Sequence, residues 1–357
     1  MKQSRIFAIS LYLLLVHTAG ITARPVNWVT KDKRIFRHYT VQPADALIIN
    51  NKFGQVHINT WDKNEVTIDI KVTAKSRSED KSQEILDHVS FDEQSKEPGR
   101  HDISITTVIA EKYTICCNDD VKIDYTISAP RKNAIDIKNK FGDVFVSDFE
   151  GKMQMDEQFG ALTTQKITGG DKQIKVSFGS ADIGYIESGD LDISFSKLTI
   201  EDARDITVSN KYGKSIINSV HNLDIKQRYG DLNIGTVSRL EGSAEYSGVN
   251  IEKVSKSCDM TLKYCGKANF ASIGAGVDLF SLRASYGSVH CNIDEGADLT
   301  IDAAATYGSV KYEGGGSLEF SEIGSGSYNH TQTYKGKAGA GKGKMDVDIK
   351  YGSLTIK

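Results

Sequence analysis

Three pairs of neighbouring carboxylates are the residues in this 357-residue chain whose types and spacing could do chemistry. They are Asp119 with Asp120, Asp190 with Asp192, and Glu201 with Asp202. Paired carboxylates on either side of a glycosidic bond hydrolyse polysaccharides, and their separation sets the stereochemistry. Such pairs are also common as solvated surface residues, so the sequence favours a chain that is not an enzyme. A polysaccharide lyase or hydrolase built on a β-helix is the alternative.

Cysteine and histidine spacing gives no metal or redox motif. The five cysteines are Cys116, Cys117, Cys258, Cys265 and Cys291. None has the short paired spacing of a zinc site, and the eight histidines are scattered. No Walker, GxSxG, HExxH or Rossmann pattern occurs either. We therefore expect no catalytic residue, no cofactor and no metal, and we interpret most of the cysteines as small buried hydrophobic residues.

An aromatic residue followed by glycine recurs along the chain. Three copies read Asn-Lys-aromatic-Gly, at residues 51–54, 139–142 and 210–213. From Phe141 to Tyr307 the aromatic recurs every 17–22 residues, and Phe195, Tyr246 and Tyr264 keep it with an altered turn. A period this short predicts stacked β-coils. The predicted repeat corners are Phe53, Gly54, Phe141, Gly142, Phe159, Gly160, Phe178, Gly179, Tyr212, Gly213, Tyr229, Gly230, Tyr286, Gly287, Tyr307, Gly308, Tyr351 and Gly352.

The strands that lead into these corners alternate apolar and polar residues. Leu223, Ile225, Gln227 and Tyr229 share one parity, which predicts one inward face of a strand. Glycine would supply the positive φ that turns the corner. This parity favours a core or corner stack of the aromatic rings over an exposed ladder that binds sugar rings. The polar residues two before the aromatic predict a hydrogen-bonded ladder of Asn51, Asn139, Glu157, Asn210 and Gln227.

The elements required to position these corners define an all-β fold. We expect a single-chain β-solenoid over residues 131–357, preceded by a smaller β-rich module or cap over 24–130 with one helix around 79–91. Residues 1–23 read as a signal peptide, because Lys2 and Arg5 precede an apolar run over 6–16. The last coil, at 346–357, ends on a strand that would be uncapped. An open edge of this kind predicts an end-to-end homodimer.

The early segment FGQVHINTWDKNEVTIDIKV at residues 53–72, the signal peptide and the aromatic-Gly corners are similar to the bacterial putative-adhesin family. This domain of largely unknown function is related to auto-transporter adhesin head domains, and the resemblance covers about residues 40–357. It implies a solenoid-like envelope protein of Gram-negative bacteria and carries over no catalytic motif.

The expected function is that of an exported, non-enzymatic adhesin or scaffold, periplasmic or at the cell surface. An extended solenoid face would bind a glycan or an envelope protein. The net charge of −3 argues against nucleic acid, and no membrane segment is expected after signal cleavage. A periplasmic partner in envelope signalling is a further alternative.

Overall fold

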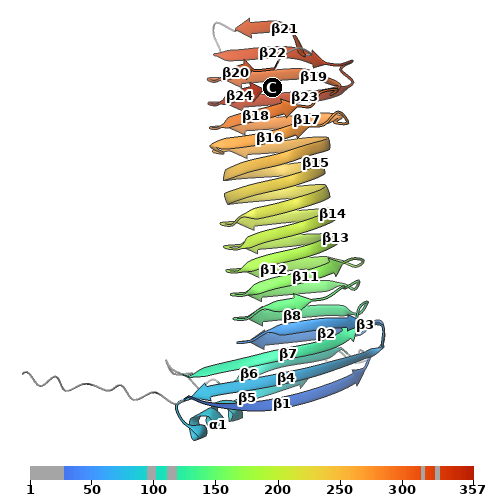
Figure 1. Cartoon of the computed structure of the whole chain (residues 1–357), viewed down its shortest axis with the longest axis vertical. Coiled ribbons are helices and arrows are strands. Elements are labelled where there is room, and N and C mark those ends of the chain that lie inside the picture. The colour runs from blue at the N-terminus through green and yellow to red at the C-terminus, as the bar shows by residue number, and fades with distance from the viewer. Residues whose placement is uncertain (1–27, 95–101, 111–118, 315–317, 326–329) are drawn as a thin grey trace, which may run out of the picture.

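The computed structural model describes residues 28–94, 102–110, 119–314, 318–325 and 330–357, and the predicted signal peptide lies outside them. The all-β prediction is confirmed, since strands stack into a long shaft (Figure 1). The described strands and helix are β1 (Val29–Thr40), β2 (Ala46–Lys52), β3 (Val56–Trp61), β4 (Glu65–Ser76), α1 (Glu79–Asp87), β5 (Val89–Gln94), β6 (Ile103–Ile109), β7 (Asp120–Pro130), β8 (Ala134–Lys140), β9 (Val144–Val146), β10 (Met153–Gln158), β11 (Ala161–Ile167), β12 (Lys172–Ser177), β13 (Ser180–Ser194), β14 (Lys197–Lys211), β15 (Ser215–Lys263), β16 (Lys267–Ile273), β17 (Leu279–Ser285), β18 (Ser288–Ile293), β19 (Leu299–Thr306), β20 (Ser309–Tyr312), β21 (Leu318–Ser325), β22 (Thr331–Ala338), β23 (Gly343–Lys350) and β24 (Ser353–Ile356).

Each coil of the shaft contains a strand before the aromatic corner and a strand after it. β10, which precedes a corner, pairs in parallel with β8 and β12, while β11, which follows the same corner, pairs in parallel with β9 and β13. The register is direct, so that Met155 lies between Ile137 and Ile174. Backbone hydrogen bonds therefore run between coils, which places equivalent residues of successive repeats side by side.

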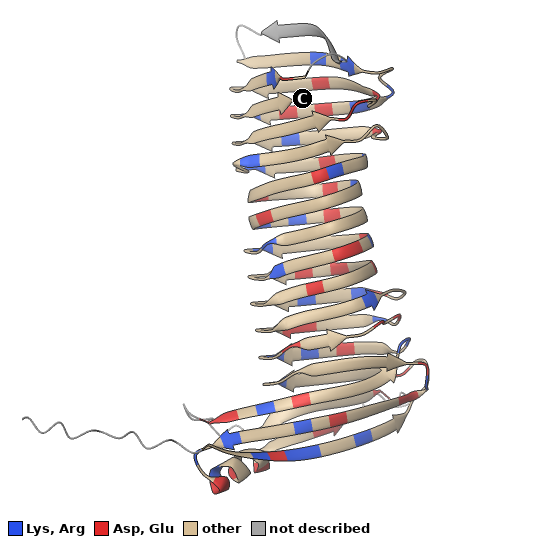
Figure 2. Cartoon of the chain, in the orientation of Figure 1, with Lys and Arg blue, Asp and Glu red and all other residues tan. Residues whose placement is uncertain are grey.

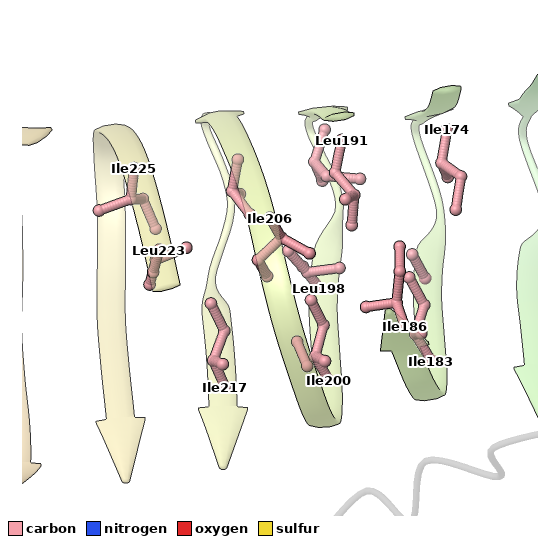
Figure 3. Close-up of a cluster of buried hydrophobic side chains, with 14 of the residues drawn as sticks. Ile174, Ile183, Ile186, Leu191, Leu198, Ile200, Ile206, Ile217, Leu223 and Ile225 are labelled. Atoms are coloured by element: carbon pink, nitrogen blue, oxygen red, sulfur yellow. The ribbon is translucent and has the colours of Figure 1, made fainter. Parts of the chain in front are cut away.

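The core fills the interior of the coils. Ile183, Ile200 and Ile217 occupy equivalent places in three successive coils and are all fully buried (Figure 3). Burial of an aliphatic side chain of this size contributes roughly 1.5–3 kcal/mol. Because a single coil could not cover its own apolar residues, stacking is what makes the repeat stable.

The N-terminal end adds antiparallel strands to the stack. β4 pairs antiparallel with β1 and with β7, and β5 pairs antiparallel with β6. The helix α1 starts at the cap residue Ser78 and buries Ile85 and Leu86, as its sequence pattern predicts, but it ends at Asp87 because β5 begins at Val89. The first coil, β2 and β3, pairs in parallel with β8 and β9. The division of the chain at residue 130 remains a proposal.

The C-terminal coil lies inside the stack. β23 pairs in parallel with β17 on one side and with β19 on the other, and β24 lies between β18 and β20 in the same way. The expectation that residues 346–357 end on an uncapped strand was therefore wrong, and this strand gives no support to an end-to-end dimer. Beyond β19, the antiparallel strands β22 and β21 complete that end.

Candidate functional site

A column of stacked aromatic rings runs along one edge of the shaft. Successive rings have centroids 4.8–5.3 Å apart and lie within 18° of parallel. In order, the rings are Phe53, Phe141, Phe159, Phe178, Phe195, Tyr212, Tyr229, Tyr246, Tyr264, Tyr286, Tyr351 and Tyr307. His330 lies against Tyr307 at the end of the column, tilted by 32°. The structure thus brings together every aromatic residue of the predicted corners.

The aromatic residue itself takes the left-handed conformation at every corner, with φ between 49° and 62°. This reverses the alternation, so that Leu223, Ile225 and Gln227 are buried while Tyr229 points outward. The prediction that Tyr229 shares their inward face was wrong for this reason. The positive φ was also expected at glycine, yet none of the described corner glycines has it. The left-handed conformation costs a residue with a side chain about 1–2 kcal/mol, and ring stacking returns about 0.5–1.5 kcal/mol per pair.

Close approach between coils is the reason for the corner glycines. A Cβ atom on Gly230 would lie 1.9 Å from the carbonyl oxygen of Gly213 in the preceding coil. Three altered corners carry a small polar side chain in place of this glycine, at Ser196, Ser247 and Cys265. Each is buried, and its hydroxyl or thiol donates to the carbonyl two residues earlier.

The rings are exposed at their edges and covered on their faces. From Phe141 onward their exposed fractions lie between 43% and 56%, although each inner ring stacks on both neighbours. The rings therefore form a corner stack, one of the two arrangements expected, and its ring edges face the solvent. Sugar rings cannot stack face to face on rings whose faces are already occupied. A ligand on this edge would meet apolar ring edges on the phenylalanines and hydroxyl groups on the tyrosines.

Charged residues border the ring column on both sides. The basic ones directly precede an aromatic residue or follow it by two or three positions: Lys52, Lys140, Lys197, Lys211, Lys214, Arg228, Lys263, Lys267 and Lys350. The acidic ones at these positions are Asp143, Asp231 and Glu245. We call the ring column with these flanking positions the aromatic edge. Basic segments recur where strands end at the left border of the shaft in Figure 2. The aromatic edge is thus cationic, in a chain whose net charge is −3.

Sequence reasoning did not single out these basic residues. The signal was available, because all three copies of Asn-Lys-aromatic-Gly place a lysine directly before the ring. In one of them, the Lys140 ammonium lies 5.1 Å from the ring of Phe141 and 5.6 Å from that of Phe159.

The predicted polar ladder forms in two places behind the corners. Asn51 donates to Asn139, and Ser215 links Asn210 to Gln227 through two hydrogen bonds of 2.8 Å. Both links are buried in the core.

Glu157 is the member of the predicted ladder without a hydrogen-bond partner. It is fully buried, and neither carboxyl oxygen is satisfied among the described residues. Burial raises the pKa of Glu157 to about 8, and the charges of Asp143 and Asp156 act in the same direction, while the Asn139 amide opposes them.

A buried lysine fixes the opposite turn of one coil. The Lys172 ammonium donates to the carbonyl oxygens of Gly151, Thr168, Gly169 and Gly170 at 2.5–3.0 Å. Its side chain is 2% exposed. No sequence pattern indicated this role, since an isolated lysine is ordinarily a surface residue.

The carboxylate pairs lie on solvent-facing positions of the shaft. Asp190 and Asp192 on β13 line a shallow trough of about 720 Å³ with Lys138, Asp156 and Lys175. A second trough of about 640 Å³ is lined by Asp205, Asp224, Arg239, Glu241 and Asp259.

The other two predicted pairs are separate from these troughs. Glu201 and Asp202 are exposed on β14, and Glu201 accepts a hydrogen bond from Asn218. Asp120 is the first residue of β7, and Asp119 directly precedes it. The carboxyl with a raised pKa, Glu157, is inside the core and out of reach of a substrate.

The cysteines that the structure describes are structural. Cys258, Cys265 and Cys291 are buried free thiols, and burial raises the pKa of each. This confirms their interpretation as small hydrophobic residues, while Cys116 and Cys117 lie outside the described residues. Among the described residues no group of three potential ligands could hold a metal ion. In the same ranges no helix has both the length and the apolarity to cross a bilayer.

No protein-family model matches the sequence, and no curated protein matches it. Among solved structures, the chain is similar to a "putative cell adhesion protein" from Clostridium sporogenes, with 11% identity and a TM-score of 0.20 over 92% of this chain and 99% of that one. It is also similar to a "putative adhesin" from Bacteroides fragilis, with 12% identity and a TM-score of 0.31 over 91% and 97% of the two chains. Likenesses this weak assign neither family nor function, and the link to auto-transporter head domains remains a prediction.

Proposed function

We propose that the chain is a non-enzymatic adhesin or scaffold that works outside the cytoplasm and binds its partner along the aromatic edge. The single observation that supports this most is the unbroken column of exposed rings from Phe141 to Tyr307. A rigid column that repeats every coil offers many equivalent contacts to an extended ligand, as repeat proteins with long binding faces do. The proposed partner is a glycan or another surface protein.

A polysaccharide lyase or hydrolase is the second candidate, and the trough beside Asp190 and Asp192 is what favours it. Catalysis by two carboxylates requires one of them to be protonated at working pH, through burial or a neighbouring charge. Both side chains are solvent-facing. We therefore place binding ahead of catalysis.

One experiment separates the two candidates. The mature protein, from about Arg24, is applied to a broad glycan array, and the release of reducing sugars is assayed on the same glycans. The proposal predicts binding without turnover. Sugar release that Asp190→Asn or Asp192→Asn abolishes would replace it with the enzyme. A silent array with no release would contradict glycan adhesion and favour a protein partner.

A further inference from the structure

The basic residues of the aromatic edge are not required by the coil. Serine occupies the position before the ring at Ser177, Ser194 and Ser285, and it follows the corner at Ser180. The backbone and the ring stack are the same at these coils as at the basic ones. The fold therefore does not require lysine at these positions.

Most of the basic groups in the middle of the edge have no acidic partner. Among the described residues no ion pair involves Lys197, Lys211, Lys214 or Lys267, whereas Arg228 and Lys263 pair with Glu245 at 2.6 and 3.8 Å. Parallel pairing puts Lys211 directly beside Arg228, and Lys197 and Lys214 hold the same position in adjacent coils. Like charges this close repel each other. An anion lying between them would relieve that repulsion.

We infer that the aromatic edge between Phe195 and Tyr264 binds a linear acidic polysaccharide, one that carries a carboxylate on each sugar residue. This inference rests on the proposed function and names its ligand class. The polymer lies parallel to the shaft, so that one sugar residue matches one coil at the 4.8–5.1 Å ring spacing. Its carboxylates pair with the lysines that flank Phe195, Tyr212 and Tyr264, and its hydroxyl groups meet the tyrosine hydroxyls.

The closed ring column favours an acidic glycan over a nucleic acid. Proteins that bind single-stranded nucleic acid stack the bases on open aromatic faces. The rings of Tyr212, Tyr229 and Tyr246 offer no open face, because each is sandwiched between its neighbours. Sugar hydroxyls and carboxylates need only the polar ring edges and the ammonium groups.

The test compares two charge-matched triple variants. One removes the edge charges with Lys197→Ser, Lys214→Ser and Lys267→Ser, since Lys211 also lines the trough beside Asp190 and Asp192. The control removes three exposed lysines from the trough side of the strands with Lys138→Ser, Lys175→Ser and Lys226→Ser, at a position where Ser209 and Ser243 occur naturally. Circular dichroism melts establish that both variants keep the fold. Binding is measured by biolayer interferometry on immobilised polygalacturonate, on its fully methyl-esterified neutral form, and on poly(dT).

The inference predicts that wild type binds polygalacturonate and not the ester, and that added salt weakens the complex. The edge variant should lose about tenfold in affinity and the control less than about twofold. Equal losses in both variants would overturn the inference, since they would show diffuse electrostatic attraction. Tighter binding of poly(dT) would overturn it in favour of a nucleic acid. Equal binding of the ester would overturn the acidic ligand while leaving glycan adhesion intact, whereas silence on polygalacturonate and on the glycan array would remove both proposals.

Discussion

The ring of Tyr286 stacks on the ring of Tyr351, with centroids 5.0 Å apart and planes 7° apart. Tyr307, which follows Tyr286 by one repeat in the sequence, stacks on the other face of Tyr351 at 5.2 Å. In chain order, β17 and β18 form one coil, and β19 and β20 form a later one. The last strands, β23 and β24, lie between these two coils. The order of the rings records this insertion directly.

Because the last coil is inserted between two others, a destabilising substitution in it should affect both neighbouring coils. Ile349→Ala opens a cavity in the fully buried core of β23 and should cost about 2–5 kcal/mol. Hydrogen exchange should then quicken in β17 and β18 as well as in β19 and β20. Thr355→Ala, at a less buried position on β24, is the control and should leave exchange in all four strands unchanged. Faster exchange confined to residues 343–357 would contradict the insertion.

Gly230 should be among the residues least tolerant of substitution. Gly230→Ala places a Cβ atom 1.9 Å from the Gly213 carbonyl oxygen, and relief requires the two coils to separate. We expect a loss of more than about 3 kcal/mol in the free energy of unfolding, measured by denaturant titration.

The matched control is Gly266→Ala, in the altered corner after Tyr264. A Cβ atom there meets nothing within 4 Å. We expect its free energy of unfolding to stay within about 0.5 kcal/mol of wild type. Similar effects at both glycines would show that coil spacing does not select the corner glycines.

Glu157 should make stability depend on pH. Its pKa of about 8 in the folded chain exceeds its ordinary value of 4.5, so the folded state holds the proton more tightly between these values. Stability from the neutral carboxyl is complete below about pH 4.5 and falls as the pH rises toward 8, by up to about 1.4 kcal/mol per pH unit.

Glu157→Gln removes this titration and provides an amide that can join the ladder beside Asn139. Across pH 5–8 the melting temperature of this variant should depend less on pH than that of wild type. At pH 8, which is about the pKa of Glu157 in the folded chain, its melting temperature should be the higher of the two. Glu252→Gln, at an exposed position on β15, is the control and should follow wild type. A Glu157→Gln profile as steep as that of wild type would contradict the buried-carboxyl account.

Lys172 should be essential for its turn. Lys172→Met keeps much of the side-chain volume but leaves four carbonyl oxygens without their donor. Leaving a buried carbonyl acceptor without its donor costs about 1–3 kcal/mol, so we expect a loss of at least that size. Lys175→Met, on the exposed side of the same strand, should cost less than about 0.5 kcal/mol. Chemical denaturation of the two variants in parallel decides the matter, and equal midpoints would refute the structural role of the ammonium.

The repeat period and the inward positions were predictable from the sequence. Ile174, Val176, Leu223 and Ile225 are buried where alternation places them, because strand geometry leaves only two faces. The alternation of apolar and polar residues does not show where a residue has a left-handed backbone conformation. For this reason Tyr229 was assigned to the wrong face of its strand. Nothing in the local sequence forces that conformation, which the ring stack between coils stabilises.

The place of the last coil was not predictable from spacing. Periodicity reports how many coils exist, while the order in which they stack depends on contacts between residues distant in the chain. The interval from Tyr307 to Tyr351 suggested two further coils in sequence. In the structure Tyr351 precedes Tyr307 in the column, and His330 takes the place beyond Tyr307. The basic residues of the aromatic edge could be found in the sequence. Their place on a binding surface could be inferred only once the rings were known to lie outside.

Hydroxyl-radical footprinting of the protein, free and bound to the strongest ligand found on the glycan array, tests most directly whether the aromatic edge is the binding surface. We predict that Tyr212, Tyr229 and Tyr246 lose reactivity on binding, while Tyr185, which lines a hollow near the opposite turns, keeps its reactivity. Protection of Tyr185 with unchanged reactivity along the ring column would contradict the account and move the binding surface to another face of the shaft.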